Sequence, residues 1–182
     1  MIIEFSAQPK ATNNNAKALM WVFFAIAAVA FGVTAFISVY QGVIGMVALG
    51  SITTAILMYT KYVSVKFYYD VLSLGLEEPL FVVRQTVGKR EVTLARVALA
   101  DITAIERESK AERRAHKRTK GVFLYCYAPT LSPEESYRMY VKTRHETSEI
   151  VLEGTEEFFN KIKEYIEEAK QIRAELDLAE EY

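Results

Sequence analysis

Residues 18–60 form an apolar stretch that contains no Asp, Glu, Lys or Arg. A bilayer core about 30 Å thick needs about 20 apolar residues for each helical crossing. The polar and flexible triplet Tyr40-Gln41-Gly42 divides the stretch into two parts, and each part is long enough to cross. The pattern therefore predicts a transmembrane hairpin over residues 18–61, with helices at 18–40 and 43–60.

A cleaved signal peptide is the alternative for the first apolar part. Lys10 and Lys17 precede it, and Ala28-Val29-Ala30 resembles a small-residue cleavage site. The first part is nevertheless longer than the apolar region of a signal peptide, and a second apolar part follows at once. These lengths favour the hairpin over cleavage.

The charges that flank the hairpin predict its orientation. Lys10 and Lys17 lie before it, Lys61 and Lys66 lie after it, and the turn between the helices is uncharged. Because Lys and Arg are retained on the cytoplasmic side, we expect a multi-pass protein of the cell membrane with both termini cytoplasmic.

The composition of the two spans favours an anchor over a transporter. Neither span contains an ionisable residue, whereas ion pathways and proton relays usually depend on such groups. Small residues four positions apart, Ala28 with Gly32 and Gly50 with Thr54, are expected to let the two helices approach closely.

After the hairpin, the apolar positions follow the short period of β-strands up to about Gly154. Gly88-Lys89 has the composition of a hairpin turn. The pattern predicts seven short strands, at Val63–Leu72, Leu80–Val87, Arg90–Arg96, Thr103–Glu108, Gly121–Ala128, Ser136–Arg144 and Ser148–Glu153.

The pattern then changes to a helical period over residues 155–176. One stripe of this helix is apolar, and Thr155 is placed to cap its start. We expect residues 62–176 to form an α+β domain in which one C-terminal helix closes a strongly bent, seven-stranded antiparallel sheet or barrel. Residues 1–17 are expected to be a polar N-terminal tail, and residues 177–182 an acidic tail. The stripe consists of Phe158, Ile162, Tyr165, Ile166, Ala169, Ile172 and Leu176.

The layout resembles that of bacterial membrane proteins in which a pleckstrin-homology-like (bacterial PH) domain follows a pair of transmembrane helices. The resemblance rests on 67–72 (FYYDVL), on Gly88-Lys89-Arg90 and on 97–105 (VALADITAI). It implies a PH-like cytoplasmic domain with a binding or scaffolding role rather than catalysis. Glu77-Glu78-Pro79 stands where phosphoinositide-binding PH domains carry clustered basic residues, so inositol-phosphate recognition through this loop is not expected.

Charge is unevenly distributed, although the formal net charge is only −1. Residues 110–120 carry a net charge of +5, and residues 164–182 carry −5. Counting strand directions places the basic run and the turn at residues 88–90 at the membrane end of the domain, where anionic lipid attracts Lys and Arg. A mobile, solvated loop is the alternative. The residues predicted to contact anionic lipid are Lys89, Arg90, Lys110, Arg113, Arg114, Lys117, Arg118 and Lys120.

No catalytic or metal-binding pattern is present in the sequence. His116 and His145 lack partners at metal-ligand spacing, and Cys126, the single cysteine, lies in an apolar strand and is expected to be buried. We therefore expect no enzyme activity, no cofactor, no metal and no small-molecule substrate. Nucleic acid binding is not expected either, because the basic run lacks interleaved aromatic residues.

Two functional interpretations remain open. The first is a membrane-anchored interaction or scaffolding module with an unidentified protein partner, in contact with the lipid bilayer. The second is a small accessory subunit of a larger membrane complex, such as a transport or envelope complex. In this interpretation the hairpin recognises the rest of the complex.

Overall fold

The computed structural model describes residues 2–12, 15–34, 36, 40–73, 78–117 and 119–180. The chain forms two compact units. One unit combines Met1–Ala11 with Lys66–Tyr182, and the other is Thr12–Val65. The first residues of the chain therefore belong to the same unit as the residues that follow the hairpin.

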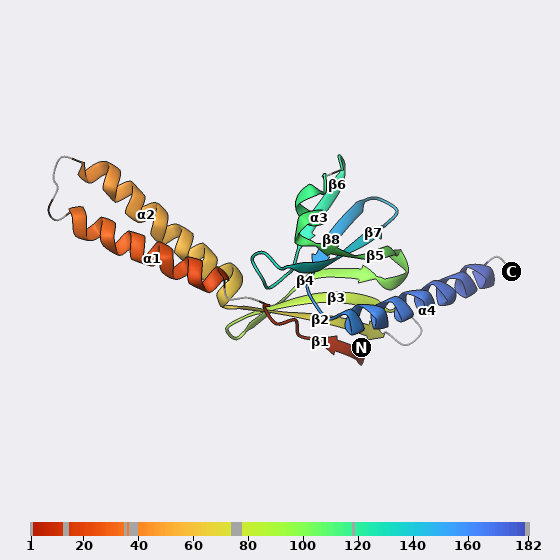
Figure 1. The fold of residues 1–182 in the computed structure, drawn as a ribbon. Coiled ribbons are helices and arrows are strands. Elements are labelled where there is room, and N and C mark those ends of the chain that lie inside the picture. Colours follow the sequence, from red (N-terminus) through yellow and green to blue (C-terminus); the bar gives the residue numbers. More distant parts are fainter. Residues whose placement is uncertain are drawn as a thin grey trace. The chain divides into compact units, whose positions relative to one another are not determined.

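The unit Thr12–Val65 is a helical hairpin. Its helices are α1 (Asn15–Thr34) and α2 (Gln41–Met58), and α2 continues into a π-helical turn at Tyr59–Val63 (Figure 1). Both are long and apolar enough, by length and composition, to span a membrane. The predicted hairpin is present, but α1 begins three residues earlier than expected and ends at Thr34; residues 35 and 37–39 of the expected helix 18–40 lie outside the described residues.

The two helices pack through small side chains. The buried positions include Ala27 and Ala30 on α1 and Ala48 and Ala55 on α2, whereas large apolar side chains such as Trp21 point outward. The predicted contact pairs were wrong: Ala28, Gly32 and Gly50 are exposed, and Thr54 is only half-buried. The helix faces are rotated by about one residue from the predicted ones, which puts alanine in the interface.

The first sheet of the other unit contains β1 (Ile2–Ala7), β2 (Val65–Ser73), β3 (Leu80–Val87) and β4 (Arg90–Ala98), in that order. β1 pairs antiparallel with β2, and Ser6 lies opposite Asp70. The expectation of a polar tail over residues 1–17 was therefore wrong, because the alternation of apolar and polar residues in Ile3-Glu4-Phe5-Ser6-Ala7 belongs to a strand. In the β3–β4 turn, Gly88 has a φ of +62°, which favours glycine.

The second sheet contains β5 (Ile102–Ser109), β6 (Val122–Cys126), β7 (Glu135–Lys142) and β8 (Thr147–Leu152), in the order β5-β7-β8-β6. A 3₁₀ turn at Leu99–Asp101 links the two sheets. All seven predicted strands are present, but they form two sheets together with β1, and β6 pairs parallel to β8. The pairing is therefore not entirely antiparallel.

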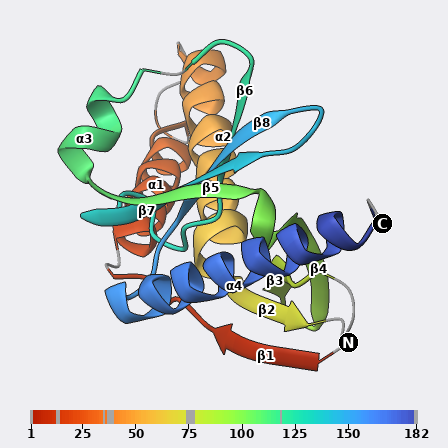
Figure 2. The ribbon, with the colours of Figure 1, turned by 90° about the vertical axis from the view of Figure 1, so that its right-hand side faces the viewer.

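Helix α4 (Glu156–Glu180) packs against both sheets (Figures 1 and 2). Its start is capped as predicted, since the Phe158 N–H donates to Thr155 Oγ1 at 3.3 Å. The Phe158 ring lies 5.9 Å from that of Tyr69 on β2, and the Phe159 ring stacks on Tyr137 of β7 at 3.8 Å. The helix thus closes the core of this unit.

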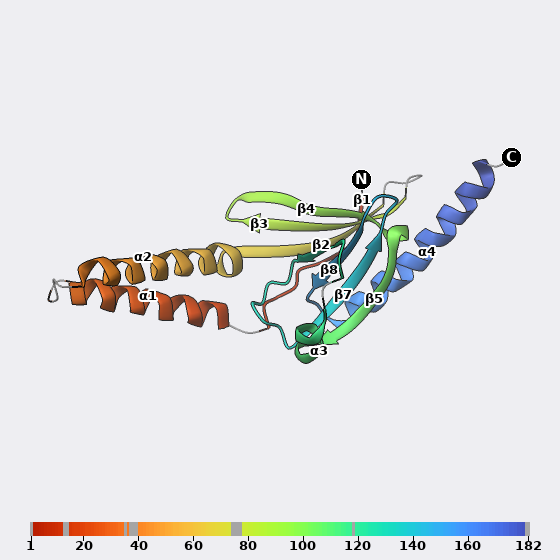
Figure 3. The same ribbon diagram turned by 90° about the horizontal axis from the view of Figure 1, so that it is seen from above.

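The helix is longer than predicted. It continues to Glu180, so the expected acidic tail at 177–182 is helical as far as the described residues reach. Its C-terminal part extends past the sheets (Figure 3), and Ile172 and Leu176 on the predicted apolar stripe are exposed there. The core of the unit includes the fully buried side chains Tyr69, Val71, Phe81, Val83, Leu99, Ile102, Met139, Leu152, Phe159 and Ile162.

Candidate functional site

The basic run begins as a short helix, not as the loop that the sequence suggested. Helix α3 (Lys110–Ala115) follows β5 directly. Ser109 caps it: the Glu112 N–H donates to Ser109 Oγ at 3.3 Å, and the Ser109 N–H donates to Glu112 Oε2 at 2.7 Å. The hydrogen bond from the Ser109 backbone lowers the pKa of the Glu112 carboxyl group.

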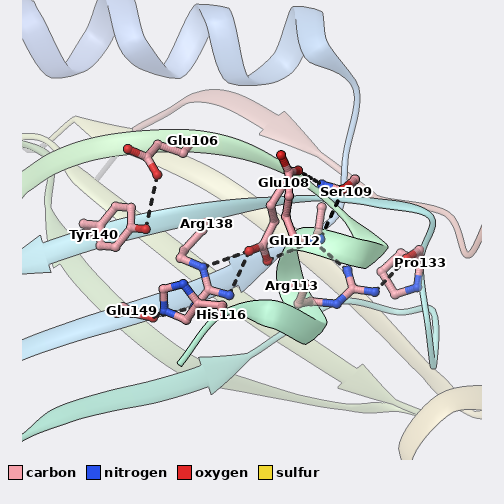
Figure 4. Close-up of polar contacts among 11 residues, drawn as sticks. Glu106, Glu108, Ser109, Glu112, Arg113, His116, Pro133, Arg138, Tyr140 and Glu149 are labelled. Atoms are coloured by element: carbon pink, nitrogen blue, oxygen red, sulfur yellow. Dashed lines mark hydrogen bonds and ion pairs between the residues drawn. The ribbon is translucent and has the colours of Figure 1, made fainter. Parts of the chain in front are cut away.

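Three basic side chains of the run are bound by the protein itself, and Figure 4 shows two of them, Arg113 and His116. Arg113 donates to Ser136 Oγ and to the Pro133 carbonyl, both at 2.7 Å. Lys110 Nζ lies 3.1 Å from Glu134, and His116 Nε2 lies 3.2 Å from Glu149. These contacts fix α3 on the outer face of the second sheet.

A buried ion-pair network lies beneath α3. The Arg138 side chain is 3% exposed and stands between Glu108 of β5 and Glu149 of β8. It donates to Glu108 Oε2 from Nε at 3.0 Å and from Nη2 at 2.8 Å, and it also donates to Glu149. Burial opposes the charge of Arg138, but its hydrogen bonds to Glu108 and Glu149 outweigh burial and raise the pKa of the guanidinium group.

The network is structural in character. Removing Arg138 would leave two buried carboxylates, Glu108 and Glu149, without the cation between them, at a cost of about 3–5 kcal/mol. The network joins β5, β7 and β8 and supports the helix above them. Sequence reasoning missed it, because Arg138 lies on the polar face of β7, with Ser136 and Lys142, and its partners come from other strands.

The exposed part of the basic run is smaller than predicted. Arg114, Lys117 and Lys120 are exposed and form no ion pair within the described part of the chain. Arg118 lies outside the described residues. Lys110 and Arg113 are held by intramolecular bonds, so they are poor candidates for an external ligand.

The other two predicted contact residues, Lys89 and Arg90, are exposed in the β3–β4 turn. This turn belongs to the first sheet, whereas α3 lies on the second sheet (Figures 1 and 3). The structure therefore divides the predicted basic residues between two separate places.

Strand β6, which follows the basic run, has an unusual exposure. The side chains of Phe123, Leu124 and Tyr125 are 51%, 45% and 39% exposed. Cys126 is also exposed, so the prediction that it is buried was wrong. The strand order places β6 last in its sheet, next to β8.

A second polar site ties α4 to the link between the sheets. Arg173 binds the Glu78 carboxylate through two bonds, of 2.5 and 2.7 Å, and binds Asp101 at 2.7 Å. The hydrogen bond from Arg173 lowers the pKa of Glu78. These residues border an open hollow of about 680 Å³, which Lys142, Thr143, Arg144 and His145 also line.

In each of these two sites, the polar side chains bond to one another. Among the residues that the structure describes, no three His, Cys, Asp or Glu side chains form a group that could hold a metal ion. Comparisons with protein-family models, curated proteins and solved structures gave no match to this chain.

Proposed function

We propose that the chain is a membrane-anchored, non-catalytic interaction module with both termini on the cytoplasmic side of the cell membrane. The pairing of β1 with β2 carries this proposal. β1 precedes the apolar hairpin and β2 follows it, yet the two strands share one sheet. A chain that leaves and re-enters the same folded unit crosses the bilayer an even number of times, in agreement with the flanking Lys10, Lys17, Lys61 and Lys66.

The fold of the cytoplasmic unit is compatible with a PH-like domain. Two four-stranded sheets and a C-terminal helix support the resemblance to bacterial PH domains. Strand β1 and the parallel β6 are departures from the expected seven-stranded antiparallel arrangement. The resemblance favours a scaffold for an unidentified protein partner and gives no reason to expect a small-molecule substrate or nucleic acid.

Contact with anionic lipid is the second part of the proposal, and it rests on the exposed cations. These are Arg114, Lys117 and Lys120 near α3 and Lys89 and Arg90 in the β3–β4 turn. The turn lies at the end of its sheet where β2 begins (Figure 3), and β2 follows the hairpin directly in the chain. Each exposed basic side chain near an anionic surface contributes about 1 kcal/mol.

The lipid contact can be measured with the full chain in nanodiscs. On a Cys126→Ser background, a fluorophore on Thr119→Cys should be quenched by nitroxide-headgroup lipid. Quenching should require anionic lipid and should weaken at physiological salt, where the Debye length is about 8 Å. Replacing Arg114, Lys117 and Lys120 by Gln should abolish the quenching. The matched control replaces Lys142, Arg144 and Lys163, which are exposed elsewhere on the same unit.

Quenching that is indifferent to salt and equal in the two triple variants would contradict a charge-driven lipid contact. The basic segment would then be a solvated connection. The anchoring proposal would survive that result, because it depends on the β1–β2 pairing.

The alternative function, an accessory subunit that is recognised through its hairpin, needs a different experiment. A chimera should keep residues 1–11 and 66–182, so that β1 stays with its sheet, and should replace the hairpin by an unrelated one. If the module recognises the partner, the chimera should co-purify from mild detergent with the same proteins as the natural chain. Loss of those proteins from a folded, membrane-inserted chimera would favour the accessory subunit.

A further inference from the structure

Within the part of the chain that the structure describes, one edge of strand β6 pairs with no other strand, and on this edge the Val122 N–H donates to the Thr119 carbonyl at 3.3 Å. The strand hydrogen-bonds to β8 on its other side and is last in the order β5-β7-β8-β6. The ladder continues with the Tyr127 N–H, which donates to the Val151 carbonyl at 3.0 Å. Because backbone groups of successive strand residues point to opposite edges, those of Leu124 and Cys126 face away from β8.

The side chains of the same strand are apolar and exposed on both faces. Phe123 and Tyr125 share one face, Leu124 and Cys126 share the other, and all four are exposed. Natural proteins usually protect such an edge with charge, proline, a bulge or a covering element. Residues 121–128 contain no charged residue and no proline, so this edge has none of the sequence-encoded protections.

The bilayer is a poor occupant for this edge. An unpaired strand edge in hydrocarbon would leave N–H and C=O groups without partners, and open sheet edges are not found facing lipid. A strand from another polypeptide satisfies the backbone groups and covers the side chains together.

The residues of β6 are complementary to themselves. In an antiparallel pair centred on Leu124, Phe123 of one copy lies opposite Tyr125 of the other, and Val122 lies opposite Cys126. Such cross-strand aromatic and aliphatic pairs are the stabilising unit of a sheet. A pair centred on Leu124 also suits the backbone. The N–H and C=O groups of Leu124 point away from β8, so they can bond to those of Leu124 in the other copy.

Charge does not oppose this pairing. The nearest described cations, Lys117 and Lys120, precede the strand. If two copies of β6 pair antiparallel, the lysines of the two copies lie at opposite ends of the strand pair. Each lies beside the uncharged segment that follows β6 in the other copy. Residues 127–133 contain no charged residue.

We propose that β6 pairs with β6 of a second copy of this chain, which joins the two second sheets into one continuous eight-stranded sheet. The contact is isologous, so it closes as a two-fold dimer and does not propagate into a fibre. The proposal is independent of the lipid contact, since the basic side chains lie outside the joint.

Cysteine crosslinking of the full chain in membranes tests this geometry. On a Cys126→Ser background, Leu124→Cys places two thiols opposite each other across the joint. Mild oxidation should yield a covalent dimer. The matched control is Val92→Cys, which is also an exposed apolar position on a terminal strand, β4 of the other sheet. It should stay monomeric.

A second measurement keeps the test independent of oxidation. Leu124→Glu should raise the concentration for half-dimerisation in detergent at least tenfold, through charge repulsion at the centre of the joint. Val92→Glu should leave it unchanged, and at concentrations below dimerisation both variants should keep the melting temperature of the natural chain. Equal crosslinking at the two positions, or dimerisation unaffected by Leu124→Glu, would overturn the proposal. A monomeric chain in which lipid or another polypeptide covers position 124 would also overturn it.

Discussion

Strands β1 and β6 both lie at the end of a four-stranded sheet, but their surroundings differ. On β1, the Phe5 ring stacks on Phe158 of α4 at 5.4 Å, and Lys161 Nζ lies 5.6 Å from the centre of the same ring. Ser6 of β1 donates to the buried Asp70 at 2.5 Å. The aromatic side chains Phe123 and Tyr125 of β6 are instead exposed.

The difference shows that the position of a strand in its sheet does not decide whether it is protected. β1 is integrated because a helix and a buried carboxylate reach it from the same unit. β6 is more apolar than β1, yet no helix of the described chain covers its aromatic side chains. An apolar edge strand that its own chain leaves uncovered is expected to pair with another molecule.

The largest effect should come from weakening the helix that covers β1. Ile162 on α4 is fully buried, so Ile162→Ala should lower the free energy of unfolding by about 2–5 kcal/mol. The exposed neighbour Lys163→Ala should change it little. Chemical denaturation of the full chain in detergent, followed by the loss of the β-sheet signal in circular dichroism, would measure both, because the strands belong to the unit that contains α4. Equal effects would show that α4 does not pack on the sheets.

The next largest effect should come from the carboxylate that holds β1. Asp70 is fully buried and pairs with Arg84 of β3 as well as with Ser6. Asp70→Asn should cost about 3 kcal/mol, the low end for a broken buried pair, because Arg84 is partly exposed and keeps its bond to Glu91. Glu91→Gln, at the exposed end of the same cluster, should cost less than about 1 kcal/mol.

A direct comparison of the two strands should give a smaller but decisive difference. Phe5→Ala removes a half-buried ring from α4 and should cost about 1–2 kcal/mol, less than for a fully buried Phe. Phe123→Ala should change the stability of the monomer by no more than about 0.5 kcal/mol. Both values should be measured at concentrations below dimerisation. A larger loss at Phe123 than at Phe5 would mean that β6 is covered within its own chain.

The smallest effect concerns the ion pair between Arg173 on α4 and Glu78, which lies just before β3. Arg173 lowers the pKa of Glu78 from its ordinary value of 4.5. The ionised form is therefore favoured in the folded state, so this pair contributes stability above about pH 4.5, and the contribution is lost as the pH falls through the lowered pKa. Both side chains are about one-third exposed, so the effect should stay below about 1 kcal/mol. In Glu78→Gln, melting curves between pH 3 and pH 6 should show a flatter profile than in the natural chain.

The sequence predicted the local elements well because their patterns are local. The hairpin, the seven strands after it and the start of α4 follow from apolar period, turn glycines and the Thr155 cap. The errors concern contacts between distant segments. Residues 2–7 have no partner strand nearby in the sequence, because β2 supplies it, 64 residues away for Ser6 and Asp70.

The candidate site was predicted less well, for the same reason. A run of basic residues shows its charge but not which side chains are already bound. Arg113 is held by Ser136 and Pro133, both more than 15 positions away in the sequence. Likewise, the apolar composition of β6 indicated a buried strand, and only the strand order places it at the end of a sheet.

Site-specific labelling of intact cells tests the central claim most directly, namely that segments on both sides of the hairpin form one unit on the cytoplasmic face. Three single-cysteine variants on a Cys126→Ser background are needed: Lys10→Cys beside β1, Gln41→Cys at the helical turn and Gln171→Cys on α4, all at exposed positions. A membrane-impermeant maleimide should label Gln41→Cys from outside and should reach the other two only after permeabilisation. Labelling of Lys10→Cys and Gln171→Cys from opposite sides would contradict the account, because β1 and β2 could then not share a sheet.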